Sequence, residues 1–140
     1  MIATEHQAAI LARIQKISIF ATLQMEVLAF DEGYCEMKVP RQKIYDGVFE
    51  SFHGGILMTI ADSVACFAIL TQTDVEQIMT TTDMNIRFLA PCLSDVVAKA
   101  RVIKLGRTMC PVAVDLFDAG GKHVAVAQVN YMLLDKMPGR

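Results

Sequence analysis

The stretch GVFESFHGGILMTIADSVACFAILTQT, residues 47–73, decides the fold of this chain. A His-Gly-Gly turn at His53 opens its long apolar run, and one carboxylate, Asp62, lies inside that run nine residues after the histidine. From residue 54 to about residue 70, apolar side chains fall on nearly every side of a helix. This pattern predicts a central helix over 54–72 that is enclosed by other elements. Because Asp62 and Ser63 interrupt the run, we do not expect it to span a membrane.

The segments around this helix predict mainly strands. Apolar spacing predicts an N-terminal helix within residues 1–17, with Thr4 as its candidate N-cap. Residues 40–53 show no clear period and are expected to form a loop. Strands are expected at 18–30, 34–39, 79–89, 95–105, 108–117 and 123–134. The order of elements predicts a single α+β domain over residues 1–140, with a largely antiparallel sheet against one central helix.

The composition limits the possible classes of function. Of the 140 residues 54% are hydrophobic, so we expect apolar surface to be buried between subunits as well as inside the domain. The net charge is −2 and the basic residues are scattered, so binding to nucleic acid or to an anionic membrane is not expected. The four cysteines form no C-x-x-C motif, so neither a metal site nor a redox pair is predicted. No secretion signal is recognisable, and the cytoplasm is the expected location.

Three motifs carry a resemblance to a known family. The sequence HGGILMTIAD at 53–62 resembles the signature of the PaaI-type acyl-CoA thioesterases, a phenylacetate-pathway and 4-hydroxybenzoyl-CoA thioesterase-like family. TTDMNIRFLAP at 81–91 and KLGRT at 104–108 are similar to later segments of that family. The resemblance covers roughly residues 20–134. It implies the hotdog fold, in which a curved sheet of about six strands wraps around the helix, and hydrolysis of acyl-CoA without a cofactor other than the coenzyme A of the substrate.

Asp62 is the first candidate catalytic residue. Hydrolysis of a thioester needs a group that attacks the carbonyl carbon or activates a water molecule. Asp62 lies about two turns past the helix start, so capping of the helix does not explain it. From the residues alone, an acid on an exposed or interface strip, paired with a base, is equally consistent. The resemblance implies that Asp62 is the nucleophile or general base.

The His-Gly-Gly turn is the second candidate. The first amides of a helix have no internal partners, and glycine lets a carbonyl oxygen approach them closely, as an oxyanion hole requires. A tight turn that needs small residues explains the glycines equally well. The resemblance implies that the Gly54 amide polarises the thioester and that Gly55 lies beside the substrate. His53 would then shape the turn or contact the thioester oxygen.

The resemblance implies further site residues. Thr81 matches a Ser or Thr that assists the attacking water from the partner subunit, although threonine is also an ordinary strand residue. Asp83 and Asn85, in the same segment, are expected to contact the substrate. The residues of the predicted glycine hairpin are expected to hold the phosphates of coenzyme A, although basic residues are common at turns: Lys104, Gly106, Arg107 and Thr108.

One departure from the family pattern keeps alternatives open. Where these enzymes often carry Asn or Gln to orient the substrate or water, this chain has Gly47. We therefore retain two other hypotheses: a hotdog hydratase or dehydratase that uses His53 with Asp62, and an acyl-CoA-binding module without turnover. A homodimer or homotetramer with a shared site is expected, because a sheet that covers a helix leaves edges exposed. Four residues are expected to line an acyl pocket or to be ordinary core: Met58, Phe67, Phe88 and Leu89.

Overall fold

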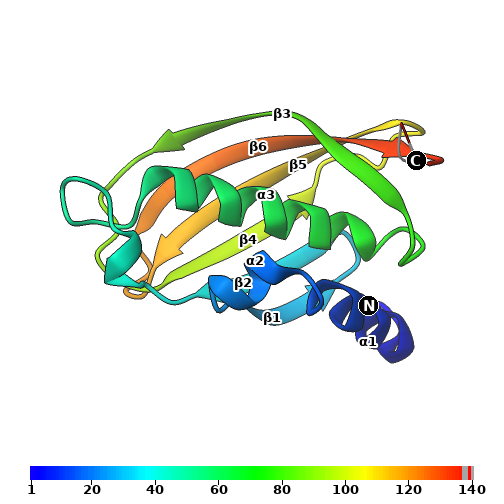
Figure 1. Cartoon of the computed structure of the whole chain (residues 1–140). Helices are drawn as coiled ribbons and strands as arrows, with labels where there is room; N and C mark the ends of the chain where they lie inside the picture. The colour runs from blue at the N-terminus through cyan, green and yellow to red at the C-terminus, as the bar shows by residue number, and fades with distance from the viewer. Residues whose placement is uncertain (137–138, 140) are drawn as a thin grey trace.

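A six-stranded antiparallel sheet curves around one long helix in the computed structural model, which describes residues 1–136 and 139 (Figure 1). The strand order is β1-β2-β4-β5-β6-β3, so β1 and β3 are the edges. The strands are β1 Glu26–Asp31, β2 Tyr34–Val39, β3 Ile78–Phe88, β4 Val96–Val102, β5 Met109–Asp118 and β6 His123–Leu134. The helices are α1 Thr4–Ile14, α2 Ser18–Thr22 and α3 Gly54–Leu70, with a short 3-10 turn at Lys43–Tyr45. The predicted α+β hotdog arrangement is confirmed.

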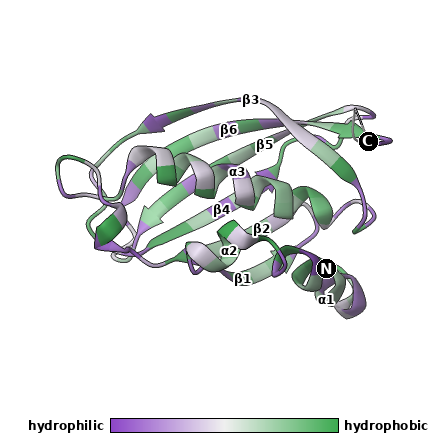
Figure 2. Cartoon of the chain, in the orientation of Figure 1, coloured by the Kyte–Doolittle hydropathy of each residue, from purple (hydrophilic) through white to green (hydrophobic). Residues whose placement is uncertain are grey.

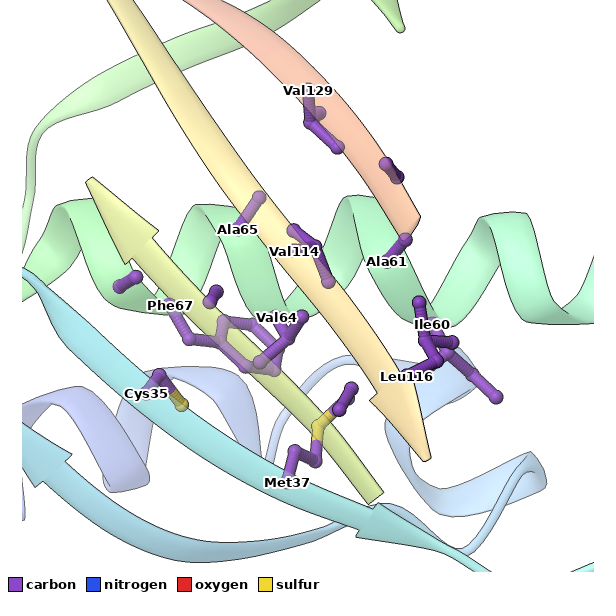
Figure 3. Packing of buried hydrophobic residues seen from close by; sticks show 14 of the residues in the cluster. Cys35, Met37, Ile60, Ala61, Val64, Ala65, Phe67, Val114, Leu116 and Val129 are labelled. Atoms are coloured by element: carbon purple, nitrogen blue, oxygen red, sulfur yellow. The ribbon is translucent and has the colours of Figure 1, made fainter. Parts of the chain in front are cut away.

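The core lies between α3 and the concave face of the sheet. Along β5 every second residue, Cys110, Val112, Val114 and Leu116, is fully buried, which is the period of two that a sheet with one covered face requires. In Figure 2 the central strands alternate between hydrophobic and hydrophilic colours along their length. Figure 3 shows side chains from α3 and from the strands that face it, and Val64 of α3 belongs to the same buried cluster as Val114 and Leu116 of β5.

The prediction that the central helix is enclosed on all sides is wrong for one of its faces. Residues at helical spacing on this face are only partly buried or exposed, among them Gly55, Thr59, Asp62, Ser63 and Cys66. The sheet covers only the opposite side of α3. The single acid of the helix therefore lies on the stripe that the rest of the chain leaves open, and α3 ends at Leu70 rather than at residue 72.

The N-terminal third also differs from the prediction. Residues 18–22 form α2 instead of a strand, because the chain closes that turn with a bond from the Met25 amide to the Phe20 carbonyl (2.9 Å) and a left-handed Gln24 (φ 55°). Five residues are too few to show helical periodicity. Thr4 is the first residue of α1 rather than its cap, and α1 covers residues 4–14 rather than 1–17. Among the described residues, no helix combines the length and apolarity needed to cross a membrane.

Candidate functional site

Asp62 is held by hydroxyl groups from two neighbouring strands. Thr81 of β3 donates a hydrogen bond to Oδ1 at 2.7 Å, and the Tyr131 hydroxyl of β6 lies 2.8 Å from the same oxygen. Hydrogen bonds to a charged group contribute about 1.5–3 kcal/mol each, so these two fix the carboxylate. Within the described part of the chain, Asp62 forms no ion pair. Pairing with a base inside the chain, one of the two explanations that the residues alone left open, is therefore not found among the described residues.

A β-bulge aims Thr81 at the helix. Thr81 pairs with Tyr131 and Asp83 pairs with Asn130, so Thr82 is the extra residue in β3. The Thr82 hydroxyl donates to the Asn130 carbonyl (3.1 Å), which ties the bulge to β6. Because of the bulge, Thr81 lies directly opposite Tyr131, and both side chains reach Asp62. Thr81 was expected to act from a partner subunit, but it already contacts Asp62 of its own chain.

The nearest thiol does not compete with Asp62 as a nucleophile. Cys66 lies one helical turn after Asp62, and its Sγ is 3.7 Å from the Met79 sulfur. Burial raises the pKa of the Cys66 thiol to about 12. Since the thiolate is the reactive form of cysteine, Cys66 is inert at neutral pH. The other cysteines, Cys35, Cys92 and Cys110, are buried free thiols.

The His-Gly-Gly turn forms the start of α3. His53 is the N-cap, and its Nδ1 accepts a hydrogen bond from the Gly55 amide at 2.9 Å. The ring proton therefore lies on Nε2, and the Gly55 amide is occupied. Within the described residues, no acceptor takes the amide of Gly54. This N–H at a helix N-terminus can receive an external anion or carbonyl oxygen.

The free amide and the acid are far apart within one chain. Gly54 and Asp62 are separated by eight residues, or about 12 Å along the helix axis. One carbonyl group therefore cannot touch both groups of the same chain. His53 and Asp62 are about 13 Å apart along the helix by the same measure, so they do not form a His–acid pair within the chain.

Arg41 organises the loop that leads into the turn. Its guanidinium binds both carboxylate oxygens of Asp46, with Nε at 3.1 Å and Nη2 at 2.6 Å, and also donates to the carbonyls of Glu50 and Leu93. Glu50 has a left-handed backbone (φ 60°), which this contact helps to hold. A Cβ at Gly47 would lie 3.8 Å from the His53 ring. Gly47 thus faces the turn but supplies no side chain to it.

An apolar groove lies next to Gly54. Its wall includes Phe49, Leu57, Phe88 and Leu89, of which Phe49 is 89% exposed. A Cβ on Gly54 would approach the Phe88 ring to 3.2 Å, so the glycine gives the ring its close contact with the helix start. Phe67, by contrast, is core, and it packs edge to face against Phe20. Of the expected pocket residues, Phe88 and Leu89 line the groove and Phe67 does not.

The remaining predicted residues lie apart from Asp62. Asp83 is on the outer side of β3, where its Oδ1 accepts from Asn130 (2.5 Å), and Asn85 is exposed on the same strand. The predicted phosphate-binding residues form the loop between β4 and β5: Lys104, Gly106, Arg107 and Thr108. The Thr108 carbonyl accepts from Leu133, which places this loop about 7 Å along β6 from Tyr131. Their roles stay predictions.

Tyr131 was missing from the predicted site. Its strand alternates, and Ala127, Val129 and Tyr131 all face the core. The alternation along β6 was therefore enough to predict from the sequence that the Tyr131 side chain faces the core. The contact of its hydroxyl with Asp62 could not be predicted, because the pairing of β3 with β6 depends on the bulge at Thr82.

A curved antiparallel sheet around one long helix defines the hotdog class. Residues 49–125 match the family model described as the thioesterase superfamily, and the chain belongs to this superfamily. Human acyl-coenzyme A thioesterase 13 is 34% identical over 94 residues, which cover 65% of this chain and 65% of that protein. The PaaI protein of Escherichia coli, from the phenylacetic acid degradation operon, superposes with a TM-score of 0.88 at 18% identity and covers 98% and 99% of the two chains. A mutant thioesterase of Pseudomonas aeruginosa gives 0.81 at 28% identity over 89% and 91%.

Proposed function

We propose that this protein hydrolyses an acyl-CoA thioester to a free acid and coenzyme A, with Asp62 as nucleophile or general base. The observation that carries the proposal is the Asp62 carboxylate itself, which lies on the open stripe of α3, is held at Oδ1 by Thr81 and Tyr131, and has no cationic partner among the described residues. Membership of the thioesterase superfamily and the similarity to an acyl-coenzyme A thioesterase support it.

Both roles of Asp62 use its free oxygen. As nucleophile, the carboxylate forms a bond to the carbonyl carbon, the C–S bond breaks, and coenzyme A leaves as a thiolate that takes a proton from water. A water molecule then hydrolyses the resulting anhydride. As general base, Asp62 removes a proton from a water molecule, which forms the new C–O bond as the C–S bond breaks.

The carbonyl oxygen needs a donor, and the Gly54 amide of a second copy fits this role. Along β3, Thr81 lies beside Asp62 of α3, and Phe88 lies beside Gly54 at the start of the helix. Met84 lies about midway between Thr81 and Phe88. A two-fold axis that passes near Met84 would therefore place Asp62 of one copy beside Gly54 of the other. The separation of about 12 Å within one chain supports such sharing, because one carbonyl group cannot contact Gly54 and Asp62 of the same chain.

The free edge of β3 supplies a way to form this dimer. β3 is an 11-residue edge strand, paired only with β6. Its outer row of amides and carbonyls can pair antiparallel with β3 of a second copy, which joins two sheets edge to edge. The apolar groove beside Gly54 would then receive the acyl group or the pantetheine arm, and the loop carrying Lys104 and Arg107 would meet the phosphates of coenzyme A.

An acyl-CoA assay of Asp62→Asn tests the proposal. This change keeps the shape of the side chain but removes the charge and the nucleophilic oxygen, so release of free thiol should fall about a thousandfold or more. Ser63→Ala is the matched control: it removes a neighbouring hydroxyl that, within the described residues, bonds only the Thr59 carbonyl (2.8 Å), and activity should stay within about twofold of the wild type.

The same assay separates the competing functions. Full thiol release by Asp62→Asn, with both variants folded, would contradict the proposal. Loss of enoyl absorbance from crotonyl-CoA without thiol release would favour a hydratase, and tight binding of acyl-CoA without turnover by the wild type would favour a binding module. The occupied Nδ1 of His53 gives the hydratase no support from the turn itself.

A further inference from the structure

The two oxygens of the Asp62 carboxylate have unequal surroundings. Oδ1 accepts from the Thr81 hydroxyl at 2.7 Å and lies 2.8 Å from the Tyr131 hydroxyl. Among the described residues, no donor reaches Oδ2. A carboxylate on a helix can otherwise turn about two side-chain bonds, and two donors on one oxygen remove that freedom.

We propose that Tyr131 is a positioning residue for the reaction: together with Thr81 it holds Oδ1 and leaves Oδ2 as the oxygen that reacts. This inference rests on the proposed hydrolytic function of Asp62. Tyr131 does not touch the substrate in this account, and it acts only through the carboxylate.

The chemistry of Tyr131 suits a donor and not a base. Its side chain is only 5% exposed, and burial raises the pKa of the phenol well above its ordinary value of 10.0. The hydroxyl therefore keeps its proton at any pH at which the protein works. The Asp62 carbonyl is also 2.8 Å away, but the single proton is drawn to the charged oxygen, which is the stronger acceptor.

The position of Tyr131 is fixed by the sheet. Tyr131 and Thr81 are direct partners in the β3–β6 ladder, so backbone hydrogen bonds hold the two donors at a constant spacing. A site that holds its reacting group before the substrate arrives loses less entropy at the transition state. Gly47 contributes no orienting side chain at the other end of α3, so in this chain orientation depends on the groups that hold Asp62.

The test compares two tyrosine-to-phenylalanine changes. Tyr131→Phe should lower kcat about 10- to 100-fold and leave KM within about twofold, because the acid loses orientation while the binding surface stays intact. Tyr34→Phe is the matched control: its hydroxyl donates to the Glu36 carboxylate at 3.0 Å on β2, so the same hydrogen-bond type is lost elsewhere. It should leave kcat unchanged. Thr81→Val, which removes the other donor, should resemble Tyr131→Phe and serves if the latter does not fold.

A double variant shows whether Tyr131 acts through Asp62. In an Asp62→Asn background, Tyr131→Phe should change the residual kcat by less than about twofold. A further loss there, or a Tyr131→Phe enzyme as active as Tyr34→Phe, would overturn the inference. If Asp62→Asn alone is fully active, the proposed function fails instead, so the two failures are distinguishable.

An infrared measurement tests the contact between Tyr131 and Asp62 independently of enzyme activity. The difference spectrum of wild type minus Asp62→Asn isolates the carboxylate stretches of Asp62. Tyr131→Phe should shift these bands, because one of two donors to Oδ1 is removed, whereas Tyr34→Phe should not. Unshifted bands in a folded Tyr131→Phe protein would contradict the proposed contact.

Discussion

The two ends of the site differ in what holds them. Asp62 lies in the middle of α3 and is held by side chains from β3 and β6, so two neighbouring strands of the sheet determine its place. The His53 turn lies at the start of α3 and follows an irregular loop that Arg41 holds through one ion pair and two carbonyls. The acid end has its donors in place within one chain, whereas the amide of Gly54 has no partner among the described residues.

This difference indicates that one chain alone can position the acid but not the donor for the carbonyl oxygen. Strand ladders fix positions accurately, so a group that must form or break bonds gains from being placed there. An oxyanion donor must meet a substrate that enters from outside, and an exposed helix start next to a groove allows this. The donors that hold Asp62 are therefore complete in one copy, whereas in the proposed reaction the binding of the carbonyl depends on a loop and a second copy.

The largest expected effect in this comparison comes from removing the free amide. Gly54→Pro deletes the N–H but keeps the helix start, because Pro is well accepted at the first helical position and His53 (ψ 129°) has the backbone that precedes proline. Loss of one oxyanion donor should lower kcat about 100- to 1000-fold. Steady-state kinetics on acyl-CoA measure the effect.

Gly54→Ala is the control for this change. It adds the same Cβ near the Phe88 ring, a half-exposed side chain that can shift, but it retains the amide. Its kcat should exceed that of Gly54→Pro by at least about tenfold. Equal loss in both variants would show that the glycine is needed for space and not for its N–H.

Complementation tests whether the two ends meet across copies. Asp62→Asn and Gly54→Pro chains, co-expressed with different tags and purified as the mixed dimer, carry one intact and one doubly defective site if Asp62 and Gly54 come from different copies. The mixed dimer should then recover about half of wild-type kcat, although each parent is nearly inactive. A mixed dimer as inactive as its parents would show that Asp62 and the Gly54 amide do not act together across copies, and a protein that stays monomeric would reject the shared site.

Much of this fold was predictable because its patterns are local. The apolar run of α3 and the alternation along β5 follow from side-chain periodicity, and both were confirmed. The short α2 was missed, since five residues carry no period and a closing bond to Phe20 ends it. The exposed face of α3 was also missed, because the composition of the helix does not indicate how much of its surface the sheet covers.

The site was less predictable for a reason of register. Asp62 and Gly54 stand out in the sequence by type and by place on the helix. The contact between Thr81, Tyr131 and Asp62 depends on one extra residue at Thr82, which shifts all that follows in β3. A bulge leaves little trace in composition, so the assignment of Thr81 to a partner's acid, rather than to its own, could not be corrected from sequence alone.

The smallest expected effect concerns the loop behind the turn. Arg41→Gln removes the bidentate contact to Asp46 and the donor to the Glu50 carbonyl, so the loop should loosen and kcat should fall about 3- to 10-fold. Lys43→Gln is the control, since it removes a nearby positive charge whose side chain has no hydrogen bond to Asp46 among the described residues, and it keeps the backbone bond from the Asp46 amide to the carbonyl of residue 43. Hydrogen exchange of the amides in residues 46–52, followed by mass spectrometry, reports the loop directly.

The pH dependence of the Arg41–Asp46 contact gives a second test of how the loop is held. The Arg41 hydrogen bond, opposed by partial burial, lowers the pKa of the Asp46 carboxyl below its ordinary value of 3.8. Asp46 is therefore ionised in the folded protein above that value, and the ion pair is lost as the pH falls through the lowered pKa. The ratio of exchange rates between Arg41→Gln and wild type should be constant near neutrality and fall toward one in acid. A ratio that stays high in acid would show that Arg41 holds the loop through the Glu50 and Leu93 carbonyls, and that the carboxylate of Asp46 contributes little to keeping the Gly54 end in place.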